Sequence, residues 1–229
     1  MDTTATLPAR ATRSRRFYVA TALAMIAAVI AGFAPSLVDT TARRAPLTPL
    51  VSLHGLLFGL WMLTFLLQAS LIARRHVAAH RKVGAVACGL AVLIVIVGYV
   101  TAGGMVRRGF DLSGDLNAQA DPALQVVFEL GDLVTFTVLT TAGVIYRRRS
   151  DVHKRLMLLG TIGGMMPASF AHLIGHFPAL HMHAPIILIP LCVFFFAPAI
   201  YDRLVIRASI RSRSGAGLRC LCGRTFERL

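Results

Sequence analysis

Six long apolar runs constrain the fold of this chain more than any other feature of its sequence. A nearly uncharged run of 18 or more residues is long enough to cross the hydrocarbon core of a membrane as a helix. The runs are Phe17–Val38, Leu50–Ile72, Val83–Val106, Ala123–Tyr146, Leu156–Phe177 and Pro185–Ala199, of which the last is the shortest, at 15 residues. The sequence therefore predicts an all-α, polytopic membrane bundle of about six transmembrane helices.

The composition leaves little room for anything else in the chain. Of the 229 residues, 56% are hydrophobic and only 15% are charged, whereas a soluble domain carries about 25% charged residues. We expect a basic N-terminal segment at 1–16, a six-helix transmembrane domain at 17–205 and a basic tail at 206–229. Both end segments are polar and Arg-rich, and we expect them to be disordered.

The placement of positive charge predicts the orientation. With the N-terminus in the cytoplasm, only four of the 24 Lys and Arg residues fall on the outer side and the other 20 fall inside. The four are Arg43, Arg44, Arg107 and Arg108. By the positive-inside rule, we expect a multi-pass protein of a bacterial cell inner membrane with both termini cytoplasmic. The net charge of +14 then faces anionic lipid headgroups, and no nucleic-acid role is expected.

A weak internal repeat joins the two inner loops. The segment from Arg74 through His80 to Val83 aligns without gaps on the segment from Arg147 through His153 to Leu156, at an offset of 73. The matching His is harder to explain by a general need for basic loops than the Arg and Lys are. We interpret the pattern as a duplicated two-helix hairpin, which makes His80 and His153 candidate cofactor ligands at equivalent positions just before two helices.

A second group of polar residues falls in the outer part of the bilayer. With a helical rise of about 1.5 Å per residue, His54, Glu129, His172 and His176 reach similar depths, and Asp132 lies nearer the middle. Polar stripes at helical spacing are expected to meet in the bundle interior. A lone ionised carboxylate near mid-membrane costs on the order of 2.5–3.5 kcal/mol, so these groups need partners.

Three functions fit this outer cluster. His54 with His172 or His176 can provide the axial ligands of haem b, and the same residues with Glu129 and Asp132 can bind a transition metal. Alternatively, Glu129 and Asp132 form a proton relay in a small proton-coupled transporter. The third alternative is a non-catalytic structural or assembly-factor role for the network.

The chain resembles a group of uncharacterised bacterial multi-pass membrane proteins, which are loosely similar to small b-type cytochromes and cytochrome-oxidase-assembly-like helical proteins. The resemblance covers about residues 17–202. It is carried by His54-Gly55 with Phe58, Trp61 and Gln68, by His80-Arg81 and Gly84, and by the run from His153 to Leu159.

The resemblance implies functional importance for His54, His80 and His153. Such relatives often carry Arg where His172 stands here, which puts the His54–His172 haem pair in doubt. The expected function is an integral inner-membrane protein that binds haem or a metal ion and transfers electrons, with a redox protein or a quinone as partner. Whether it is an enzyme does not follow from the sequence.

Overall fold

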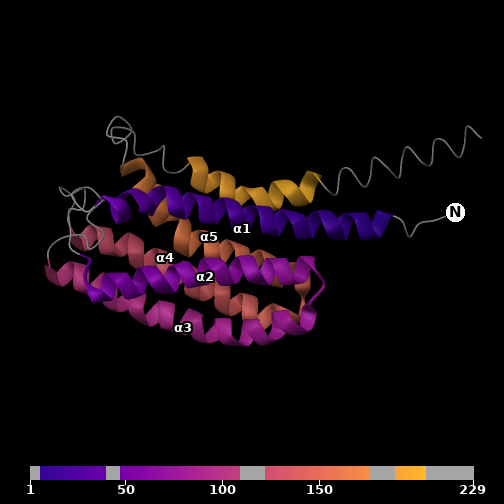
Figure 1. The fold of residues 1–229 in the computed structure, drawn as a ribbon, viewed down its shortest axis with the longest axis horizontal. Coiled ribbons are helices and arrows are strands. Elements are labelled where there is room, and N and C mark those ends of the chain that lie inside the picture. The colour runs from indigo at the N-terminus through magenta and orange to yellow at the C-terminus, as the bar shows by residue number, and fades with distance from the viewer. Residues whose placement is uncertain (1–5, 40–46, 109–121, 176–188, 205–229) are drawn as a thin grey trace, which may run out of the picture. The chain divides into compact units, whose positions relative to one another are not determined.

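The computed structural model describes residues 6–39, 47–108, 122–175 and 189–204, and within these ranges it contains helices and short turns but no strand. The helices are α1 (Thr6–Val38), α2 (Pro49–Ala73), α3 (Val77–Arg108), α4 (Pro122–Ile145) and α5 (Ser150–Gly175), with a 3-10 turn η1 (Tyr146–Arg148) before α5 (Figure 1). The predicted all-α helical bundle is confirmed.

Five helices are long and apolar enough to cross a membrane, judged by length and composition. The segments are Ser14–Pro35, Pro49–Ala73, Val77–Gly104, Val126–Arg148 and Ser150–Gly175. Part of the sixth predicted run lies outside the described residues, and 189–204 is helical. The structure divides into Met1–Leu191, which holds α1 to α5, and Cys192–Leu229. The sixth span stays a prediction.

The expected disorder of the N-terminal segment was wrong, and so was the expected position of His80 and His153 just before their helices. Helix α1 begins at Thr6, so most of the N-terminal segment at 1–16 is helical, whereas the tail at 206–229 lies outside the described residues. Helices α3 and α5 begin at Val77 and Ser150, so His80 and His153 lie inside these helices rather than before them. Neither Gly nor Pro lies between these helix starts and the histidines, and long basic side chains at a helix end can extend to the membrane surface.

The turn between α2 and α3 has a defined hydrogen-bond pattern. The His76 N–H donates to the Leu71 carbonyl at 2.8 Å and the Arg75 N–H donates to the Ile72 carbonyl at 3.1 Å. This is the Schellman arrangement that ends many helices. It places Arg75 at φ 65°, a left-handed conformation that favours Gly. This pattern ends α2 at Ala73 and lets α3 begin at Val77, two residues after Arg75.

Helix α5 is the central helix of the bundle. In its most apolar window 56% of the residues are buried, against 11–22% in the other four spans. It packs against α4 and α1, and small residues allow the approach to α4, since a Cβ built on Gly164 would lie 2.7 Å from the Cβ of Phe136. Trp61 of α2 reaches α5 through a buried hydrogen bond to the Thr161 hydroxyl at 3.1 Å.

The basic turns gather at one end of the bundle, which we call the basic end. It holds the α2–α3 turn with Arg74 and Arg75 and the α4–α5 turn with Arg147–Arg149 (Figure 1). The Lys154 ammonium lies 5.8 Å from the centre of the Tyr18 ring, which brings the first part of α1 to the same end. The position of these turns at one end agrees with the distribution of Lys and Arg in the sequence, which places both turns on the same side of the membrane. The assignment of the basic end to the cytoplasm remains a prediction.

Candidate functional site

The basic end brings together the two histidines of the internal repeat. His80 is the fourth residue of α3, and His153 is the fourth residue of α5. Both helices therefore begin three residues before the matching histidine of the repeat. The centres of the two rings lie 6.3 Å apart, with an angle of 83° between the ring planes. Two residues that are far apart in the sequence therefore face each other inside one bundle.

The backbone of a neighbouring helix holds each ring. The Nδ1 of His153 lies 2.7 Å from the carbonyl oxygen of Gly143 in α4. A carbonyl only accepts, so Nδ1 carries a proton, and in the neutral ring Nε2 then has the lone pair. The His80 ring is hydrogen-bonded to the backbone of Gln68 in α2, while its Nδ1 is buried and has no partner among the described residues. Each ring thus keeps one nitrogen for another ligand.

The side chain of Gln68 closes the region beside His80. Its Oε1 is buried and, like Nδ1 of His80, has no partner in the described part of the chain. Its Nε2 would lie 3.2 Å from a Cβ built on Gly84, one turn along α3 from His80. A buried polar atom without a partner costs about 1–3 kcal/mol. Nδ1 of His80 and Oε1 of Gln68 are two such atoms on neighbouring helices, and each can accept a hydrogen bond or bind a cation.

Two glycines beside the histidine pair are covered by side chains of neighbouring helices. A Cβ built on Gly143 would lie 2.8 Å from the Sδ of Met157, so the Met157 side chain covers that glycine. A Cβ built on Gly84 would lie 3.2 Å from Nε2 of Gln68, so Gln68 covers Gly84 in the same way.

Two positive charges lie near the histidines. Arg81 acts electrostatically on His80, and its side chain is exposed. Lys154 is 2.8 Å from the carboxylate of Asp151 in the first turn of α5. The Asp151 carboxylate offsets the charge of Lys154, and water or headgroups screen the charge of Arg81.

At the other end of the bundle, His54 and His172 each lie against an aromatic ring. The half-buried His54 stacks on Phe58 of its own helix, with ring centres 4.1 Å apart and planes at 27°. Its Nδ1 is buried and has no partner within the described ranges. His172 is only 3% exposed, and its ring centre lies 4.2 Å from that of Phe33 in α1.

The other predicted members of the outer cluster are less defined. Glu129 and Asp132 are half-buried on α4, and His176 lies outside the described residues. Within the described ranges, no group of three or more His, Cys, Asp and Glu side chains is close enough to hold a metal ion. The predicted haem or metal site of His54, Glu129, Asp132, His172 and His176 is therefore neither confirmed nor excluded.

Two groups at the basic end have no counterpart in the predicted site. Gln68 lies seven residues from Trp61 and fourteen from His54, on one polar face of α2. This spacing could have indicated Gln68, but it does not predict a chemical role for the residue. The Gly143 carbonyl carries no sequence signal, because every residue has a carbonyl and only the packing of α4 on α5 selects this one.

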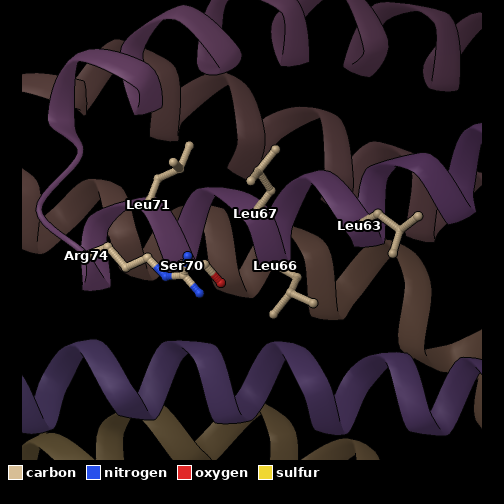
Figure 2. Close-up of a pocket in the computed structure, with 6 residues that line it drawn as sticks. All are labelled: Leu63, Leu66, Leu67, Ser70, Leu71 and Arg74. Carbon is tan, nitrogen blue, oxygen red and sulfur yellow. The ribbon is translucent and has the colours of Figure 1, made fainter.

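The surface of α2 carries an open hollow of about 310 Å³. Figure 2 shows its lining, which is one face of α2 with a basic residue at one end. The lining residues are Leu63, Leu66, Leu67, Ser70, Leu71 and Arg74. In a membrane, such a face suits a lipid acyl chain with its headgroup near the Arg, and we assign it no catalytic role.

No protein-family model, curated protein or solved structure matches this chain. The resemblance to small b-type cytochromes therefore remains a prediction. Any function must be argued from the residues themselves, and the histidine pair at the basic end provides the strongest chemical evidence.

Proposed function

We propose that this membrane protein binds a redox-active metal centre, either a haem iron or a transition-metal ion, between His80 and His153, and that it transfers electrons. The observation that carries the proposal is the facing pair of rings from α3 and α5, 6.3 Å apart. The coarser conclusion, a membrane protein built from apolar helices, rests on the fold alone.

The separation of the rings suits a shared metal. A metal lies about 2.0–2.1 Å from a ligating imidazole nitrogen, so it lies about 3 Å from the ring centre. Two imidazoles on opposite sides of one metal then have centres about 6 Å apart by the same geometry. The observed 6.3 Å supports such an opposed arrangement, which both axial haem ligation and two-coordinate metal ions use.

The hydrogen bonds of the rings support the same function. A metal-ligating His usually donates its other N–H to a carbonyl or a carboxylate, which fixes the ring and raises the basicity of the ligating nitrogen. The Gly143 carbonyl does this for His153 and the Gln68 backbone does it for His80. These residues hold and orient the ligands, and the metal supplies one-electron chemistry that the side chains lack.

Absorbance and elemental analysis of the purified full-length protein test the proposal. We expect either a Soret band or about one transition-metal ion per chain, lost in both His80→Ala and His153→Ala and retained in the matched variant His54→Ala. Native protein without haem and without metal contradicts the proposal. Loss in His54→Ala with retention in His80→Ala would assign the cofactor to the outer cluster instead.

Proton-coupled transport is the second candidate, because α4 carries the half-buried carboxyl groups of Glu129 and Asp132 within a membrane-spanning segment. Such residues often lie on proton pathways. The test is substrate accumulation in vesicles under a pH gradient. Accumulation that collapses in Asp132→Asn but survives in His80→Ala favours transport over the redox function.

A further inference from the structure

We infer that Gln68 completes the histidine pair, so that its side-chain oxygen, Nδ1 of His80 and Nε2 of His153 form a three-donor site for a small transition-metal ion. This inference rests on the proposed function and makes it more specific. It adds a ligand from a third helix and selects a metal ion over haem.

The first argument is the lone pairs that the three side chains present. The carbonyl of Gly143 takes the proton of His153 Nδ1, and the backbone of Gln68 takes the ring proton of His80. Nδ1 of His80 and Oε1 of Gln68 are both buried without a partner among the described residues. His80 and His153 have their ring centres 6.3 Å apart, and the Gln68 amide lies beside Gly84, one turn from His80 along α3. Three acceptors on adjoining helices suit a shared cation, or water molecules in its place.

The second argument is the space. The Gln68 amide fills the position over Gly84, and the Met157 thioether fills the position over Gly143. Because neighbouring side chains cover both glycines beside the histidines, a single ion fits there more readily than a porphyrin ring does.

The third argument is the origin of the donors. His80, His153 and Gln68 lie on α3, α5 and α2, and α4 supplies the carbonyl that orients His153. A metal ion would therefore tie together three helices near the basic end. Two imidazoles and one amide oxygen suit a late first-row divalent ion. The carboxylate of Asp151 offsets the nearby positive charge of Lys154, which would otherwise repel such an ion.

Cobalt binding tests the role of Gln68. The purified full-length protein is freed of metal with a chelator and titrated with Co²⁺, and the visible absorption of bound Co²⁺ gives the affinity and the coordination geometry. We expect one Co²⁺ per chain in the wild type. Gln68→Leu should weaken binding about 10–100-fold, and Gln68→Glu, with an anionic oxygen, should tighten it about 10-fold.

A matched control is Gln125→Leu, which removes the other glutamine of a described helix, near the start of α4. We expect it to leave Co²⁺ binding unchanged. Circular dichroism and the elution volume of each variant check that the helices and the assembly are retained, so a loss of binding can be assigned to the lost donor.

The outcomes separate this inference from the proposed function. If both Gln68 variants bind Co²⁺ like the wild type while His80→Ala loses it, Gln68 is no ligand and the proposed function stands. A Soret band from haem held by His80 and His153 also overturns the inference alone. If His80→Ala and His153→Ala bind Co²⁺ as the wild type does, the inference and the small-ion form of the proposed function both fail.

Discussion

The two ends of the bundle hold similar numbers of membrane histidines in different surroundings. At the basic end, His80 and His153 face each other, and neighbouring helices hold both rings through backbone hydrogen bonds. At the other end, His54 stacks on Phe58 and His172 packs against Phe33. The first arrangement brings two imidazole rings together, whereas the second places each imidazole against the ring of a phenylalanine.

This difference shows why the depth of a histidine in the membrane does not identify a ligand. The depth of a residue follows from the helical rise and from the orientation of the chain. On this basis, histidines are expected near both ends of the bundle. A ligand additionally needs a second ring at metal-sharing distance and a partner for its other nitrogen. The following predictions test whether the two ends differ in this way.

The largest expected effect separates His153 from His172. His153→Ala removes a proposed ligand, so we expect Co²⁺ affinity to fall by at least about 100-fold. His172→Ala leaves binding unchanged but lowers the free energy of unfolding, because His172 is only 3% exposed. Calorimetric titration and thermal unfolding in detergent measure the two quantities. Equal loss of binding in both variants would remove the distinction between the ends.

The next effect comes from the backbone that orients His153. In Gly143→Ala the new Cβ would lie 2.8 Å from Sδ and 3.2 Å from Cγ of Met157, so the Met157 side chain must move, and a shift of α4 that accompanies this movement displaces the Gly143 carbonyl. Loss of such an orienting bond costs about 10–100-fold in metal affinity. The control is Gly89→Ala, where nothing lies within 4 Å of the added Cβ. Unchanged Co²⁺ affinity in Gly143→Ala would show that the carbonyl does not orient the ligand.

Phe33 tests the packing role of His172. Phe33→Leu removes the ring that lies 4.2 Å from His172, and an aromatic pair contributes about 0.5–1.5 kcal/mol beyond its buried area. We expect lower stability in a denaturant titration and unchanged metal binding. Phe128→Leu, at a ring that is 70% exposed, provides the control. A drop in metal affinity in Phe33→Leu would instead connect His172 to the cofactor.

The smallest effect lies between the two ends. Trp61→Phe removes the buried hydrogen bond to the Thr161 hydroxyl, which still donates to the Met157 carbonyl at 2.8 Å. We expect a loss of about 1 kcal/mol in the free energy of unfolding and no change in metal binding. Tyr99→Phe, at an exposed ring, is the control. A much larger loss would make Trp61 a main determinant of the fold.

The sequence predicts most of the helices and one of the two histidine groups. Five apolar runs became membrane-length helices because nearly uncharged runs of that length have few alternatives. The repeat placed His80 and His153 at equivalent positions, and the structure brings them together because both hairpins begin their second helix in one register. The predicted starts of α3 and α5 were too late because basic residues were taken as a loop signal, although they are good helix formers.

The rest of the site depends on the rotation of each helix about its axis, which residue spacing does not give. The spacing placed His54, Glu129 and Asp132 at related depths, but it could not show which neighbour each side chain contacts. The Gly143 carbonyl and the Gln68 amide became visible only once α2, α4 and α5 were packed around His80 and His153.

Electron paramagnetic resonance of the Cu²⁺-loaded full-length protein tests the central claim most directly, because nitrogen hyperfine splitting counts the coordinated imidazoles. Our account predicts two imidazole nitrogens in the wild type and in His54→Ala, and one in His80→Ala and in His153→Ala. Two nitrogens retained in both His80→Ala and His153→Ala, or a nitrogen lost only in His54→Ala, would contradict it.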